Sequence, residues 1–264
     1  LLNTEGASNT ALGISSLCNN TTGTCNTAVG HTALNKNTTA SCNTAVGSRS
    51  LYSTTSGEDN TAVGNYALCK NTTGECNVAV GVMALQLNTT AECNTAVGMH
   101  AMCKSTTACR NTAIGAFASF TATTGHQNTA IGQGALYSMT DGGNNTAIGR
   151  NAGSSVTTGN NNVLLGYLAG TDAVRTVTNG QNNIVIGNNS SATAHIKIDW
   201  TVTSDLRDKT NIETVPHGLD FVNQITPIKY KFKKSREDNT PTGLTKYGFK
   251  AQEILELEGD NPVI

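Results

Sequence analysis

The chain has 264 residues, a formal net charge of −1 and 13% charged side chains, about half the share found in an average soluble domain. A charge balance this close to zero excludes a broad electrostatic surface for nucleic acid or for an acidic membrane. No stretch approaches the roughly 20 consecutive apolar residues that a membrane-spanning helix needs, so membrane insertion is not expected either.

A seventeen-residue repeat fills most of the chain. Each unit closes on a glycine, and these glycines recur at constant spacing: Gly13, Gly30, Gly47, Gly64, Gly81, Gly98, Gly115, Gly132, Gly149 and Gly166. Gly187 follows after twenty-one residues. A short fixed period is the signature of a solenoid, because its units bury their apolar faces only by stacking. We therefore expect an all-β solenoid with seventeen-residue coils over residues 1–190, followed by a connecting strand over 191–203.

Each coil divides into short predicted elements. The phrase Thr-Ala-Val, as at 27–29, is too short for a helix and predicts one strand per coil. The stretch x-Ala-Leu after the glycine, as at 32–34, predicts a second short strand. The phrase Asn-Thr-Thr-Gly, at 20–23 and 71–74, is typical of a turn, because Asn bonds its own backbone and Gly tolerates positive φ.

Side chains of a strand alternate between its two faces, which assigns the repeated positions to the inside or the outside of the coil. Ala28 and its equivalents are small enough for the interior of a flattened coil, so Val29 points outward. The outward column is Val29, Val46, Val63, Val80, Val97, Ile114, Ile131 and Ile148. An apolar ridge of this length predicts partner chains, and we expect a homo-oligomer.

Two polar columns accompany this ridge. The first is the asparagine series Asn26, Asn43, Asn60, Asn77, Asn94, Asn111, Asn128, Asn145 and Asn162, which predicts a ladder of side-chain hydrogen bonds from coil to coil. The second is a threonine series that begins at Thr10 and Thr27. Regular hydroxyl arrays of this kind also resemble ice-binding faces, which leaves a second function open.

All eight cysteines lie between residues 18 and 109. Three pairs recur across one turn of a coil, which favours disulfides in an extracellular fibre: Cys18 with Cys25, Cys69 with Cys76, and Cys103 with Cys109. Cys42 and Cys93 have no partner in their own coil. The alternative is a reduced protein with buried cysteines. Zinc is not expected, since His31 and His100 share no column with the thiols and His126 shares one with Cys109 alone.

Residues 204–264 differ sharply from the repeats in composition. This segment holds nineteen of the charged residues and all four prolines, whereas residues 1–203 hold sixteen charged residues and no proline. A change of this size predicts a separate domain.

Both parts resemble known families. The Asn-Thr-Ala-Val-Gly coils resemble the head repeats of trimeric autotransporter adhesins and related shafts of phage tail fibres. The resemblance implies a left-handed parallel β-roll with three chains around a common axis. The stretches Ser204–Lys209, Ile225–Phe232 and Tyr247–Ile254 resemble the C-terminal intramolecular chaperone of endosialidase tailspikes, a small α+β domain that holds three chains together and then cuts itself off.

The chaperone resemblance also predicts a site for self-cleavage, between Thr203 and Ser204. Ser204 is the candidate nucleophile and Lys209 its candidate general base, since a Ser-Lys pair is a known variant of serine catalysis. This is a single-turnover serine peptidase reaction with no external substrate. The alternative is that Ser204 caps a helix and Lys209 is a solvated charge.

These observations together predict a structural and adhesive phage tail-fibre segment, located in the virion or outside the cell. The expected partners are two further copies of the chain and a host surface glycan or receptor. No cofactor or metal is expected. The alternative function is a secreted or cell-surface β-solenoid binding module, either an adhesin or an ice-binding protein.

Overall fold

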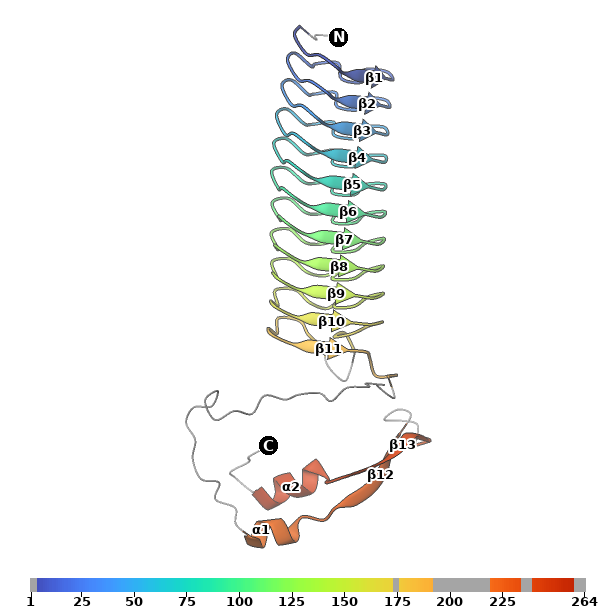
Figure 1. The fold of residues 1–264 in the computed structure, drawn as a ribbon, viewed down its shortest axis with the longest axis vertical. Coiled ribbons are helices and arrows are strands. Elements are labelled where there is room, and N and C mark those ends of the chain that lie inside the picture. Colours follow the sequence, from blue (N-terminus) through green and yellow to red (C-terminus); the bar gives the residue numbers. More distant parts are fainter. Residues whose placement is uncertain (1–3, 173–175, 192–218, 234–238, 259–264) are drawn as a thin grey trace. The chain divides into compact units, whose positions relative to one another are not determined.

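The computed structural model describes residues 4–172, 176–191, 219–233 and 239–258. The chain divides into two compact units, residues 1–188 and 189–264. The N-terminal unit is a column of stacked coils in which each coil contributes one strand to the same sheet (Figure 1). The predicted parallel β-solenoid is therefore confirmed.

The strands of this column are three residues long and follow one another in sequence order. The described part of the column contains β1 (Thr10–Leu12), β2 (Thr27–Val29), β3 (Thr44–Val46), β4 (Thr61–Val63), β5 (Val78–Val80), β6 (Thr95–Val97), β7 (Thr112–Ile114), β8 (Thr129–Ile131), β9 (Thr146–Ile148), β10 (Val163–Leu165) and β11 (Ile184–Ile186). Each strand pairs in parallel with the next, so that Ala28 faces Ala45 and identical residues stack. The offset is seventeen residues until Val163 faces Ile184, where the coil is longer.

The interior of each coil is narrow and filled by small and medium side chains. Ala28 and its equivalents in the strands are fully buried, as the alternation of faces predicts. Ala33 and Leu34 are buried from the opposite side of the coil. Successive coils thus share one continuous apolar core along the column.

The predicted second strand in each coil is wrong. Residues 31–36 form turns, although Ala33 and Leu34 do contribute to the core. Thr32 and Leu34 have φ angles of 55° and 48°, in the left-handed region, and the same values recur at equivalent positions along the column. A β-strand needs negative φ, so these two residues make corners that return the chain toward the next strand.

The glycines serve two different purposes. The closing glycines have strongly positive φ, such as 134° at Gly81, where a Cβ would also lie 2.6 Å from the carbonyl oxygen of Gly98. Gly74, in the Asn-Thr-Thr-Gly phrase, does not have the predicted positive φ. It is required there by close approach, since a Cβ would lie 2.4 Å from the carbonyl oxygen of Ala91.

The predicted asparagine ladder is present in the core. The Asn77 backbone N–H donates to Asn60 Oδ1 at 3.0 Å, and Asn77 Nδ2 donates to the same oxygen at 3.1 Å. The second Nδ2 bond reaches the carbonyl of Ala91 at 2.8 Å, in the following coil. Asn94 then repeats the pattern on Asn77 Oδ1. A buried amide that satisfies two neighbouring coils ties their backbones together.

A second, shorter ladder lies in the turn phrase. Asn37 Nδ2 donates to Asn20 Oδ1 at 2.7 Å, and Asn88 Nδ2 donates to Asn71 Oδ1 at 2.8 Å. All four side chains are fully buried. The following coils carry Thr54 and Ser105 at this position, and the Oδ1 atoms of Asn37 and Asn88 have no donor within the described part of the chain. The sequence pattern predicts only a local turn at Asn20 and Asn71 and does not indicate this ladder.

The C-terminal unit has α1 (Leu219–Gln224), β12 (Ile228–Lys233), β13 (Pro241–Gly248) and α2 (Ala251–Glu258). β12 and β13 form an antiparallel pair with a register shift between Tyr230 and Phe232. Two short helices beside a hairpin agree with the predicted small α+β domain. Lys250 and Glu253 form an ion pair at the start of α2.

Candidate functional site

The strand column presents an apolar ridge to the outside. The residues that follow the buried alanines are half-buried or exposed in the single chain: Val29, Val46, Val63, Val80, Val97, Ile114, Ile131 and Ile148. The exposed fractions of Ile114 and Ile148 are 39% and 42%. The prediction that this column points away from the coil interior is confirmed. Continuous apolar surface of this length is typical of an interaction face.

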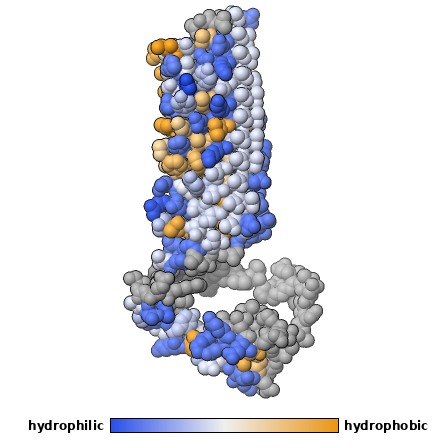
Figure 2. All heavy atoms as spheres, turned by 180° about the vertical axis from the view of Figure 1, so that it is seen from behind, coloured by the Kyte–Doolittle hydropathy of each residue, from blue (hydrophilic) through white to orange (hydrophobic). Residues whose placement is uncertain are grey.

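A second strip of the column combines aromatic rings with cationic side chains. Rings stack from coil to coil, with centroids of His100 and Phe117 5.1 Å apart and those of Phe120 and Tyr137 5.3 Å apart. Lys104 Nζ lies 5.0 Å from the Phe120 ring centroid. Figure 2 shows apolar side chains gathered toward one edge of the column, interspersed with strongly hydrophilic ones.

The same arrangement recurs in other coils. Arg49 lies 5.3 Å from the ring centroid of Tyr66 and 5.9 Å from that of Tyr52, and Arg150 lies 4.6 Å from that of Tyr167. We call these residues, with His100, Lys104, Phe117, Phe120 and Tyr137, the aromatic–basic strip. The sequence analysis did not identify it. The signal was available, because these residues recur one, two, five or six positions after the closing glycines.

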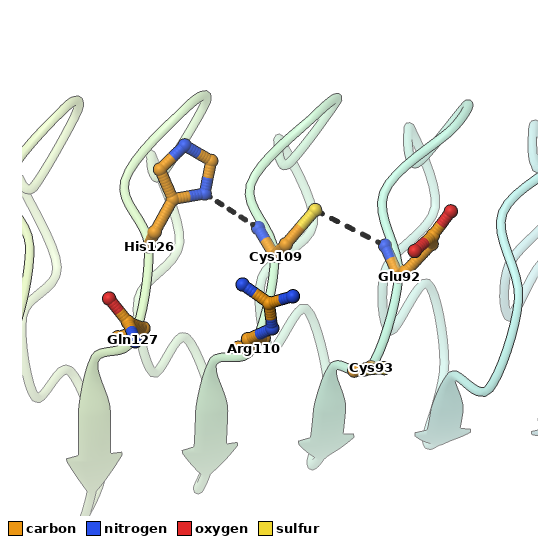
Figure 3. A pocket seen from close by; sticks show the side chains of 6 residues that line it. All are labelled: Glu92, Cys93, Cys109, Arg110, His126 and Gln127. Atoms are coloured by element: carbon orange, nitrogen blue, oxygen red, sulfur yellow. Dashed lines mark hydrogen bonds between the residues drawn. The ribbon is translucent and has the colours of Figure 1, made fainter.

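A shallow groove lies just before strands β6 to β8, lined by Glu92, Cys93, Cys109, Arg110, His126 and Gln127 (Figure 3). The Cys109 backbone N–H donates to His126 Nδ1 at 3.0 Å, and the Glu92 backbone N–H donates to Cys109 Sγ at 3.4 Å. His126 Nδ1 is thus occupied by a backbone amide and does not act on the thiol. The geometry supports coil stacking rather than nucleophilic catalysis.

No group of three or more His, Cys, Asp or Glu side chains in the described ranges is placed to hold a metal ion. No helix within those ranges is long and apolar enough to cross a membrane.

The eight cysteines are free thiols in the structure and lie in three environments. Cys69 and Cys103 are buried, and burial raises the pKa of both thiols while Lys70 and Lys104, respectively, oppose the shift. Cys25, Cys42, Cys76 and Cys93 are exposed, whereas Cys18 and Cys109 are half-buried. The pairing of Cys18 with Cys25, Cys69 with Cys76 and Cys103 with Cys109 stays a prediction.

The predicted cleavage site lies outside the described residues. Thr203, Ser204 and Lys209 all fall in the range 192–218, so their geometry adds nothing to the argument from sequence.

The C-terminal unit has its own exposed apolar surface. Val222, Tyr247 and Phe249 are 59%, 76% and 54% exposed in the single chain. Exposed apolar side chains of this size are typical of an interaction surface.

Comparison with known families identifies the C-terminal segment. Residues 204–261 match the family model described as the chaperone of endosialidase. No curated protein and no solved structure shows significant similarity to the chain. The protein thus combines a tail-fibre-like parallel β-solenoid with a C-terminal domain of the endosialidase chaperone type.

Proposed function

We propose that this chain is a segment of a homotrimeric bacteriophage tail fibre, located in the virion, whose C-terminal domain guides assembly and is then released. The observation that carries the proposal is the order of the two parts. A solenoid with an apolar outer ridge precedes a segment that matches the chaperone of endosialidase.

The ridge supports self-association of the shaft. Val80 and its equivalents form a straight line, because every strand stacks in register on the next. Three copies around a common axis bring three such lines together and remove them from water. Burial of this kind stabilises an assembly by about 25 cal/mol per Å² of apolar surface.

The repeat also explains why a chaperone is needed. Adjacent coils present the same residues to their surroundings, so a slip of one chain past another by one coil preserves most side-chain contacts. Assembly that depends on distant and intermolecular contacts is slow and prone to errors. A domain that joins three chains at one end sets their register before the shafts close.

Replacing Val80 with Asp tests the trimeric shaft. We expect the full-length protein to form a trimer and the Val80→Asp variant to be monomeric. The trimer of the variant would bury three unpaired carboxylates, at a cost on the order of 3 kcal/mol for each ion. Light scattering after size-exclusion chromatography measures the mass. Thr73→Asp is the matched control, since Thr73 is exposed and the equivalent residue four coils later is naturally Asp141. A monomeric unmodified protein, or a trimeric Val80→Asp variant, would contradict the proposal.

We also propose a single self-cleavage between Thr203 and Ser204. Ser204 Oγ attacks the carbonyl carbon of Thr203 while Lys209 Nζ takes its proton, the Ser204 amine leaves, and water hydrolyses the resulting ester. Lysine can act as a base when burial or a nearby cation lowers its pKa.

The cleavage is tested by expressing the full-length gene beside the Ser204→Ala and Lys209→Ala variants and comparing fragments after denaturation. The unmodified protein should give two fragments, with the second beginning at Ser204, and both variants should stay intact. Lys229→Ala serves as a control that keeps the cleavage. An uncut unmodified protein, or a fragment that begins elsewhere, would show the assignment to be wrong.

A second candidate function is adhesion through the aromatic–basic strip. Exposed Tyr137 and Tyr167, with the cations beside neighbouring rings, offer apolar faces and hydrogen-bond donors to a host surface glycan or receptor. The genes beside this one distinguish a virion protein from a secreted adhesin. Baseplate or capsid genes there favour the fibre.

A further inference from the structure

Four of the eight cysteines occupy one column, two residues before each strand. Reading along the shaft, this column contains Cys25, Cys42, Asp59, Cys76, Cys93 and Arg110. The cysteines therefore form two pairs in successive coils, separated by one aspartate.

The backbone holds both members of a pair in the same conformation. The φ angles are 57° and 60° at Cys25 and Cys42, and 56° and 57° at Cys76 and Cys93. Because the coils repeat, equal backbone angles at equivalent positions aim the two Cβ atoms in the same direction.

Direct hydrogen bonds join the coils at these residues. The Cys42 backbone N–H donates to Thr24 O at 3.0 Å, and that of Cys93 donates to Glu75 O at 3.1 Å. Each acceptor is the residue just before the partner cysteine. Neighbouring chains in β structure lie about 4.8 Å apart, within the Cα separation of roughly 4.4–6.8 Å that a disulfide requires.

The two thiols of each pair are near enough to influence each other. Cys25 contributes to the raised pKa of Cys42, and Cys93 contributes to the raised pKa of Cys76. All four are exposed, so a small oxidant can reach them.

The other cysteines have no thiol beside them in their own columns. Cys69 is buried and stands between Tyr52 and Gln86, and Cys103 Sγ donates to Gln86 Oε1 at 3.6 Å. Cys109 has the amide of Glu92 on one side and His126 on the other.

We propose that Cys25 with Cys42, and Cys76 with Cys93, form disulfides that staple successive coils of one chain. The oxidant is a small-molecule disulfide such as oxidised glutathione. Each staple forms by two exchange steps, in which two protein thiols lose two protons and two electrons and one glutathione disulfide is reduced to two thiols. The proposal accounts for Cys42 and Cys93, which have no partner within a coil, and it does not depend on the trimer.

The surroundings of the thiols set the conditions for the reaction. Partial removal from water raises the pKa of Cys42, and the carboxylate of Asp59, the Cys25 thiol and the carboxylate of Glu58 add to the shift. Partial removal from water also raises the pKa of Cys76. Smaller contributions in the same direction come from Cys93, Asp59 and Glu75. The thiolate is the attacking form, so exchange is run at mildly alkaline pH.

The test maps the links in the full chain. The reduced protein is equilibrated with oxidised glutathione, alkylated with iodoacetamide and digested without reductant by trypsin and a glutamate-specific protease. Cleavage after Lys, Arg and Glu places Cys42 on fragment 37–49, Cys76 on fragment 76–92 and Cys69 on fragment 59–70. We expect 37–49 linked to 6–36, and 76–92 linked to 93–104.

Fragmentation assigns the link within the two fragments that carry a second cysteine, 6–36 with Cys18 and 93–104 with Cys103. The Cys42→Ser variant should lose the first link and keep the second. Cys69→Ser is the control and should keep both.

Three outcomes would overturn the proposal. The first is a link between 59–70 and 76–92, or a loop within 6–36, because these are the pairs within a coil. The second is alkylation of all four thiols after equilibration. The third is a link between isotope-labelled and unlabelled chains in a mixed assembly, which would place the bond between copies.

Discussion

Replacing Gly81 with alanine is expected to lower the melting temperature of the protein by about 6 to 12 °C, which corresponds to roughly 3 kcal/mol for a chain of this size. Two effects combine at this residue. Its φ of 134° belongs to a region that only glycine adopts readily, and the added Cβ would lie 2.6 Å from Gly98 O and 2.7 Å from Gly98 C. Both contacts are with backbone atoms, so the two coils must separate.

Gly143→Ala is the matched control for this experiment. A Cβ at Gly143 meets its nearest atom, His126 O, at 3.3 Å, and the equivalent positions of other coils carry Glu75 and Cys109. We expect a change within about 0.5 kcal/mol. Thermal unfolding followed by circular dichroism gives both values, and equal melting temperatures for the two variants would refute this account of the closing glycines.

Replacing Asn77 with alanine is expected to cost about 1 to 3 kcal/mol, because one buried backbone group is left without its partner. The Asn94 N–H loses the Asn77 Oδ1 acceptor, whereas the carbonyl of Ala91 loses the Asn77 Nδ2 donor but keeps the Asn88 Nδ2 donor at 3.2 Å. The site is fully buried, so water does not replace them. Equilibrium unfolding in denaturant measures the loss.

Two further variants separate the hydrogen bonds from the lost volume. Asn65→Ala removes an exposed asparagine whose single side-chain bond, to Ser48 O, is 3.5 Å long, and we expect almost no change. Asn77→Asp keeps the size but buries a carboxylate against the Ala91 carbonyl. Burial raises the pKa of such a carboxyl, so this variant should become more stable, relative to the unmodified protein, as the pH falls. An Asn77→Ala variant as stable as Asn65→Ala would be inconsistent with a structural ladder.

The parts of the fold that could be predicted from sequence are those with a simple geometric signal. The glycine spacing sets the coil length, and the alternation along Thr27, Ala28 and Val29 separates the inside from the outside. The unbroken asparagine column predicts a ladder because amides at equal positions stack at hydrogen-bonding distance.

The parts that could not be predicted depend on backbone conformation rather than residue type. Leu34 has a φ of 48°, a conformation that leucine rarely adopts, so the pattern Ala-Leu suggested a strand where the chain forms a corner. Asn20 looked like a turn residue because the same side chain can form a turn or a ladder. The spacing of seventeen residues places Cys25 and Cys42 in one column of the sequence, but only the parallel register of the strands shows that equivalent residues of successive coils lie side by side.

The number of coils determines the length of the shaft. Every coil contacts mainly the coil before and the coil after it, through the same parallel pairing. Deleting residues 78–94 would join Asn77 to Thr95 and restore the phrase Asn-Thr-Ala-Val-Gly across the junction. The shaft would become shorter by one coil, about 4.8 Å, and no contact of a new kind would be required. Duplication or loss of seventeen codons can therefore change the length of the shaft in fixed steps of one coil.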